Sequence, residues 1–205
     1  MPFLAPLLGR EKVIHTEGIR PTNYMTVVLN RNYVRPALND VLQQMEKDLK
    51  NSGVDIRYLD ANFPFINGFP LLPHLSHKDG KKIDLSLIYE TKTGVLTDRQ
   101  RSRSGYGHFE PPKTGEKDQI KYCLDNGYWQ YDYPKYLTLG SINPELIFSE
   151  RGTQKLIKTV LEQSQIGKLF VEPHLQDRLG LRHKRIRYHG CRAVRHDDHI
   201  HIQLK

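Results

Sequence analysis

The chain is poor in cysteine, and this scarcity limits the kinds of metal site it can build. Cys123 and Cys191 are the only two cysteines among 205 residues, and neither lies in a CxxC pair, which excludes a cysteine-based zinc site. The sequence leaves open whether they form one disulfide in an oxidising compartment or remain two buried thiols.

Targeting and membrane-spanning segments are also missing from the sequence. No apolar run approaches the roughly 18 residues that a transmembrane helix needs, so we expect no such helix. The first nine residues lack the basic region, long apolar region and cleavage site of a complete signal peptide. We therefore expect either the remainder of a trimmed signal or an ordinary extended tail.

Signatures of nucleic-acid binding are absent, although the formal net charge is +8. No helix-turn-helix, C2H2 finger or RNA-binding motif is recognisable, so no nucleic-acid partner is expected. The excess of basic residues fits either a solvated surface or the binding of an acidic polymer, such as an anionic cell wall, as substrate or scaffold.

The patterns that are present predict one α+β domain over residues 1–205. Apolar periodicity predicts two amphipathic helices, over residues 36–50 and 153–165. Alternation predicts strands, which we place at residues 54–59, 83–89, 169–172, 191–194 and 199–204. Residues 1–35 are expected to be extended, and residues 97–136 to form a long polar insertion loop. The expected fold is a small, mostly antiparallel sheet with helices packed on one side.

Histidines gather in two places, and each place offers polar side chains on one face of a strand. In the first, Gly80 allows a turn between His77 and a strand on which Asp84 faces away from the apolar side. In the second, His199 and His201 share the polar face of a strand near the C-terminus. Either cluster alone is more typical of an ordinary half-exposed strand than of a ligand set.

Together, the two clusters indicate a metal centre. If the two strands, each with an apolar inward face, pair with each other, His77, Asp84 and His201 come to one point. Two imidazoles and one carboxylate form a normal catalytic zinc set with a fourth position for water. The zinc lowers the pKa of that water, which becomes the nucleophile. We therefore expect one zinc ion per chain.

The order His77-x6-Asp84, followed far downstream by His199-x-His201, resembles the LAS metallopeptidases. This group contains lysostaphin-type enzymes, D-Ala-D-Ala metallopeptidases and the hedgehog signalling domain. The segment from Arg195 to His201 is particularly similar to the penicillin-insensitive murein endopeptidases. The resemblance covers about 20 residues directly. It implies a LAS/hedgehog-like fold, hydrolysis of peptide bonds in peptidoglycan stem peptides or cross-links, and a periplasmic or cell-envelope location.

The resemblance also implies roles for individual residues. His77, Asp84 and His201 would bind zinc, and Asp198 would be the catalytic base, three positions before the last ligand. His199 would polarise the water or stabilise the oxyanion, and His196 matches a further family histidine and is the rival base. A regular strand turns both residues 196 and 198 away from the face of His201, so a bend near Asp198 is required.

The sequence departs from the family pattern at three positions. Ser86 stands where murein endopeptidases usually carry a second aspartate, and Leu75 stands where many relatives have serine. Asp198 is shorter by one methylene group than the usual glutamate. These differences bear on the substrate and the base more than on the metal site.

Other polar residues have two interpretations each. His74 is either a fourth metal ligand or a residue that lines the loop, and we favour the second interpretation. His108 and Glu110 either reach the cleft or lie on the surface, and we favour the surface. The arginines Arg99, Arg101 and Arg103 either bind a substrate carboxylate or form a solvated loop, which is the simpler reading.

Three functions remain to be separated. The first is a zinc peptidase acting on peptidoglycan, and the second is a zinc-bearing binding module of the same fold without turnover. The third, a metal-dependent nuclease, would need mainly oxygen ligands, and the imidazole-rich set favours zinc instead. Asp198 and His196 favour the enzyme over the binding module. Which peptide bond is cut, and the oligomeric state, do not follow from the sequence.

Overall fold

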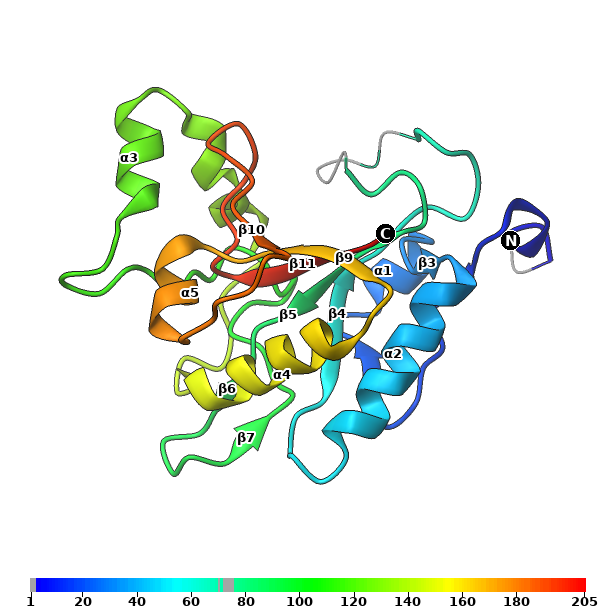
Figure 1. Cartoon of the computed structure of the whole chain (residues 1–205), viewed down its shortest axis with the longest axis horizontal. Helices are drawn as coiled ribbons and strands as arrows, with labels where there is room; N and C mark the ends of the chain where they lie inside the picture. The colour runs from blue at the N-terminus through cyan, green and yellow to red at the C-terminus, as the bar shows by residue number, and fades with distance from the viewer. Residues whose placement is uncertain (1–2, 70, 72–75) are drawn as a thin grey trace.

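A six-stranded sheet organises the computed structural model, which describes residues 3–69, 71 and 76–205 (Figure 1). In spatial order its strands are β10 (Ile186–Arg187), β9 (Ile166–Phe170), β11 (His199–Leu204), β5 (Lys82–Ser86), β4 (Ile56–Asp60) and β2 (Ile19–Pro21). The three central pairings, β9–β11, β11–β5 and β5–β4, are antiparallel, and the two outer pairings are parallel. The predicted α+β class with a mostly antiparallel sheet is confirmed.

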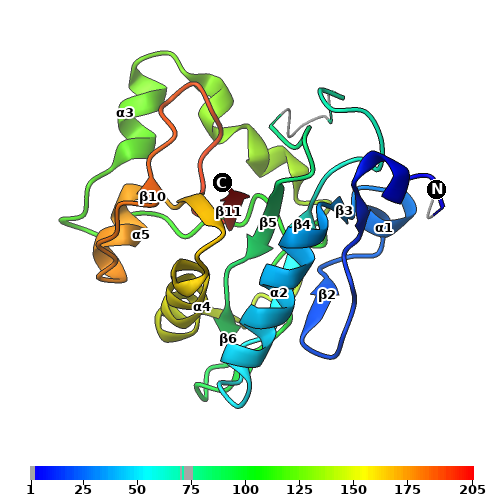
Figure 2. The same cartoon turned by 45° about the vertical axis from the view of Figure 1, so that its right-hand side comes forward.

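Two long helices, α2 (Pro36–Leu49) and α4 (Glu150–Glu162), cover one side of this sheet (Figure 1 and Figure 2). The apolar stripe of α2 is buried, as its periodicity predicts. Helix α4 begins three residues before the predicted start, because the Ser149 side chain accepts a hydrogen bond from the Gly152 N–H at 3.3 Å. The helices and the apolar side of the strands form the main core.

The N-terminal segment is less extended than expected. Its elements are η1 (Pro6–Leu8), β1 (Glu11–Lys12), the strand β2 of the main sheet, α1 (Met25–Val28) and β3 (Tyr33–Val34). Strands β1 and β3 form a separate two-stranded sheet. Short elements that are held by non-local pairing leave no periodic pattern in the sequence, so the extended prediction for residues 1–35 is wrong.

Two further predictions about the middle of the chain are wrong. The strand expected at residues 83–89 stops at Ser86, and the chain then enters a second sheet, ordered β7-β6-β8. Its strands are β6 (Tyr89–Glu90), β7 (Leu96–Thr97) and β8 (Ile147–Phe148). The expected loop 97–136 contains α3 (Gln119–Asp125) and most of η2 (Trp129–Leu137).

The strand predicted at residues 191–194 does not form. Cys191 is bonded to Cys123 of α3, with their Cα atoms 5.3 Å apart. Residues 191 and 192 form a turn rather than a strand, so the bond holds this turn on α3. Helix α5 (Pro173–Arg178) lies between β9 and β10 in the chain. Of the two alternatives that the sequence leaves open, one disulfide or two buried thiols, the structure has the disulfide.

None of the helices in the described ranges is long and apolar enough to cross a membrane.

Candidate metal centre

The pairing of β5 with β11 places the two strand ligands opposite each other. His201 is the register partner of Asp84, and His199 is the partner of Ser86. Alternation turns the neighbouring isoleucines and leucines to the other face, where they join the core. Asp84 and His201 therefore share the polar face, as the sequence predicts.

A turn brings His77 to the same place. Gly80 has φ of +78°, which favours glycine, and its N–H donates to Asn62 Oδ1 at 3.1 Å. The Nδ1–H of His77 donates to the carbonyl oxygen of Ala61 at 2.7 Å. That bond fixes the tautomer, so the lone pair of neutral His77 lies on Nε2.

Three basic atoms converge in the resulting cluster. His77 Nε2 lies 3.2 Å from His201 Nδ1 and 3.2 Å from Asp84 Oδ1, and the last two atoms are 2.8 Å apart. All three residues are buried. Each side of the triangle is therefore close to 3 Å, and water has little access to it.

This donor set fits a metal ion. In the metal-free molecule, protons shared among Asp84, His201 and His77 can satisfy these contacts. A single ion with ligands at about 2.0–2.2 Å satisfies all three atoms, and spacings near 3 Å suit such ligands. The ion would not satisfy the other ring nitrogen of His201, Nε2, which is buried and makes no hydrogen bond within the described part of the chain.

The ionisation states of His201 and Asp84 suit metal binding. Burial lowers the pKa of His77, but the Asp84 charge raises it overall, so a bound metal would replace a proton on His77. Burial lowers the pKa of His201 to about 4, which leaves the ring neutral near pH 7. Burial alone would raise the pKa of Asp84, but the charges of His77 and His199 hold it well below its ordinary value. A neutral imidazole and an ionised carboxylate are the forms that bind a metal.

Sequence reasoning missed Tyr106, which lies within the expected polar loop. Its hydroxyl donates to Asp84 Oδ2 at 2.7 Å, and its ring meets His199 edge-on with centroids 5.1 Å apart. Burial, followed by the Asp84 charge, raises the Tyr106 pKa well above its ordinary value, so the hydroxyl stays a donor. The flanking Gly105 and Gly107, with φ of +86° and +76°, were the available signal of a tight turn.

Asp198 and His199 form a pair beside the cluster. Asp198 Oδ1 contacts His199 Nδ1 at 2.5 Å, and Asp198 Oδ2 accepts the Gly107 N–H at 2.6 Å. Residues 197 and 198 form the bend that was predicted near this point. His199 Nε2 faces Asp84 Oδ2 at 3.9 Å. Burial lowers the pKa of His199, but Asp198 and Asp84 together raise it to about 9.

His196 lies next to these rings. Its ring centroid is 4.6 Å from that of His199 and 5.9 Å from that of His201. The structure therefore brings together all six predicted site residues. His74 and Leu75 lie outside the described residues.

The basic loop residues are largely neutralised. Arg99 pairs with Glu145 at 2.8 Å, and Arg101 pairs with Glu110 at 3.3 Å, whereas Arg103 is exposed. Glu110 also ties the loop to the site, since its N–H donates to the Asp197 carbonyl oxygen at 2.8 Å.

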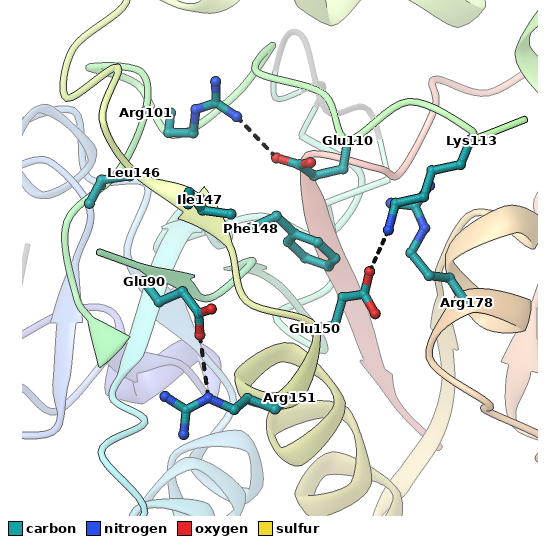
Figure 3. A pocket seen from close by; sticks show the side chains of 10 residues that line it. All are labelled: Glu90, Arg101, Glu110, Lys113, Leu146, Ile147, Phe148, Glu150, Arg151 and Arg178. Carbon is teal, nitrogen blue, oxygen red and sulfur yellow. Dashed lines mark hydrogen bonds and ion pairs between the residues drawn. The ribbon is translucent and has the colours of Figure 1, made fainter. Parts of the chain in front are cut away.

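A separate pocket of about 620 Å³ contains Arg101 and Glu110 (Figure 3). Its other lining residues are Glu90, Lys113, Leu146, Ile147, Phe148, Glu150, Arg151 and Arg178. Three ion pairs cross it, Arg101–Glu110, Lys113–Glu150 and Arg151–Glu90, and Arg178 pairs with Glu116. Its charges are thus already matched, and none of the six site residues belongs to this lining.

Comparison with known protein families gives no match, and no curated protein matches the chain significantly. The resemblance to LAS metallopeptidases therefore rests on the motif itself.

Proposed function

We propose that the protein is a zinc metallopeptidase of the LAS type that hydrolyses peptide bonds of peptidoglycan stem peptides or cross-links. The observation that carries the proposal is the convergence of His77 Nε2, Asp84 Oδ1 and His201 Nδ1, each within 3.2 Å of the others. The motif order and the adjoining Asp198–His199 pair add support.

The His77–Asp84–His201 set would hold one zinc ion. Two imidazoles and a carboxylate favour zinc over magnesium or calcium, which prefer oxygen ligands. When bound, zinc supplies a Lewis acid that polarises a carbonyl and lowers the pKa of water. Tyr106 orients the Asp84 carboxylate, and Ala61 orients the His77 ring.

His199 and Asp198 would handle charge and protons beside this set. His199 Nε2 points toward Asp84, and the protonated ring would stabilise negative charge developing on a substrate oxygen. Asp198 holds the ring through Nδ1. Both roles need water excluded, and both residues are buried.

Asp198 remains the preferred base, with His196 as its rival. Both oxygens of Asp198 are engaged in the substrate-free molecule, one by His199 and the other by the Gly107 N–H. We propose that Asp198 itself takes the proton of the attacking water, through an oxygen freed from one of these contacts, and returns it to the leaving amine, while His199 stays protonated.

A cell-envelope location accompanies the proposal. The net charge of +8 suits an anionic cell wall, and the Cys123–Cys191 disulfide suits an oxidising compartment. Fractionation of cells carrying the untrimmed gene checks this. A purely cytosolic protein would refute it.

The function is tested by digesting purified peptidoglycan with the zinc-loaded protein and identifying the muropeptides by mass. We expect cleaved stem peptides or cross-links with intact glycan strands, and no products from the zinc-depleted protein. A protein that binds zinc and releases no peptide fragments would instead be the non-catalytic binding module.

The base is tested by measuring turnover and zinc content of Asp198→Ala and His196→Ala side by side. Loss of a true base with the metal retained should lower kcat by roughly 10²–10⁴-fold. Near-normal turnover of zinc-loaded Asp198→Ala would exclude Asp198. Near-normal turnover of both variants would refute the mechanism.

A further inference from the structure

A second group of ligating side chains lies beside the first, formed by Glu172, His189 and His196. One ligand atom from each lies within 4.8 Å of the others. Glu172 is fully buried, and the side chain of His189 is 5% exposed. The rings of His189 and His196 are in contact, with centroids 4.1 Å apart. None of the three residues belongs to the His77–Asp84–His201 set.

Each of the three side chains keeps one polar atom without a hydrogen bond in the described part of the chain. These atoms are Glu172 Oε2, His189 Nε2 and His196 Nδ1, and all are buried. Buried polar atoms are normally satisfied, because leaving one unpaired costs its full desolvation. Three such atoms from one cluster indicate a shared partner.

A simple ion pair does not account for this arrangement. His189 Nε2 lies 3.6 Å from Glu172 Oε1, so a contact between them would still leave Glu172 Oε2 and His196 Nδ1 unsatisfied. A cation that accepts lone pairs from all three residues would satisfy them together.

We propose that Glu172, His189 and His196 form a second transition-metal site, suited to zinc, adjacent to the first. Two imidazoles and one carboxylate are borderline ligands, which favour zinc and related ions over magnesium and calcium. The site is independent of whether the protein hydrolyses peptides. Coordination through Nδ1 would also prevent His196 from taking up a proton there, which favours Asp198 as the base.

The surrounding residues fix these ligands in place. Tyr131 Oη donates to Glu172 Oε1 at 2.6 Å, and the His196 N–H donates to the same oxygen at 2.9 Å. The His189 ring contacts its neighbouring Gly190 carbonyl oxygen through Nδ1 at 3.1 Å, so a proton on Nδ1 leaves the lone pair on Nε2. The same tautomer is set at His77 by Ala61.

The disulfide adds a covalent constraint. Cys191 lies two residues after His189 and is bonded to Cys123 of α3. The loop that carries His189 is therefore tied to the helix, and its approach to Glu172 does not depend on side-chain contacts alone.

The test is to strip the oxidised protein with a chelator, reload it with zinc alone, and measure bound zinc by elemental analysis after desalting. We expect two zinc ions per wild-type chain and one in His201→Ala, which disables the first site. We expect one in His189→Ala and in Glu172→Gln, and none in the double variant His189→Ala/His201→Ala. The matched control is His183→Ala, at an exposed histidine outside both clusters, and it should bind two.

The result that overturns the proposal is a wild-type chain with one zinc ion that His201→Ala loses and His189→Ala keeps. It is also overturned if folded His189→Ala and Glu172→Gln both keep two ions. Circular dichroism checks folding, and the conservative Glu172→Gln substitution serves if His189→Ala unfolds. A protein with two zinc ions and no peptidase activity would refute the proposed function and leave the second site standing.

Discussion

At the residue scale, Asp84 makes three contacts in the first metal cluster: Asp84 Oδ1 lies 2.8 Å from His201 Nδ1 and 3.2 Å from His77 Nε2, and Asp84 Oδ2 accepts the Tyr106 hydroxyl at 2.7 Å. Side chains alternate between the two faces of a strand, and this alternation places Asp84 and His201 on the polar faces of their strands. The register between the strands then sets the two residues opposite each other. Tyr106 was not predictable in the same way, because it reaches Asp84 from a loop without periodicity. The second cluster was missed because Glu172 and His189 come from separate connections that only the tertiary fold brings together.

The role of Tyr106 gives a first prediction. Tyr106→Phe removes the donor to Asp84 Oδ2 while keeping the ring, and loss of such an outer partner should weaken zinc binding at the first site by about 10-fold or more. Zinc competition with a chelating dye, in a His189→Ala background, measures that site alone.

The matched control for Tyr106 is Tyr33→Phe. Tyr33 is also fully buried, but its hydroxyl makes no hydrogen bond in the described part of the chain. This variant should keep wild-type zinc affinity. If Tyr106→Phe and Tyr33→Phe bind zinc equally well, Tyr106 does not orient the ligand.

At the scale of elements, periodic segments were predictable and segments held by non-local contacts were not. Helix α2 and strand β11 match their predictions because each carries a complete pattern of its own. The strand predicted at residues 83–89 is too long, because the apolar residues continue past Ser86 although the main-sheet strand ends there. Tyr89 instead pairs with Thr97 and Phe148 in the second sheet. Nothing local in the sequence marks that change of sheet.

The turn before Tyr106 gives the second prediction. At Gly105, φ is +86°, and an added Cβ would lie 2.0 Å from Leu59 Cδ2. Gly115 has a similar φ of +89°, but an added Cβ meets nothing within 4 Å. Gly105→Ala should therefore destabilise the protein by about 2 kcal/mol more than Gly115→Ala, because only the former adds a core clash.

Urea unfolding of the two alanine variants measures this difference. Gly105→Ala should also weaken zinc binding, since it displaces Tyr106. Equal unfolding free energies would show that the backbone strain, common to both positions, accounts for the whole effect.

At the scale of the whole molecule, ion pairs and the disulfide fasten the 97–136 segment to the main body. Arg178 of α5 holds Glu116 through both carboxylate oxygens, at 2.9 and 2.5 Å. The disulfide joins residues 68 apart in sequence. Closing a loop of that size lowers the entropy of the unfolded chain, which stabilises the folded protein by about 4 kcal/mol.

The Glu116 contact gives a third prediction, on pH. The hydrogen bonds from Arg178 lower the pKa of Glu116 from 4.5 to about 2. A carboxyl group with a lowered folded-state pKa stabilises the protein fully above its unfolded pKa, and the contribution is lost as the pH falls through the folded value. Stability from this contact should therefore decline between about pH 4.5 and pH 2.

Urea midpoints at pH 5 and pH 3 measure this decline. Glu116→Gln should lower the midpoint at pH 5 and reduce the drop between the two pH values. Glu162→Gln, at an exposed position at the end of α4, is the control and should keep the wild-type drop. An unchanged drop in Glu116→Gln would contradict the assignment.

His77, Asp84 and His201 are proposed to hold a zinc ion, and the zinc content of the wild type compared with that of His201→Ala tests this binding without any assay of activity. Elemental analysis of both proteins, folded and loaded in parallel, should show one zinc ion fewer per chain in His201→Ala. Equal zinc content in the two proteins would contradict the claim.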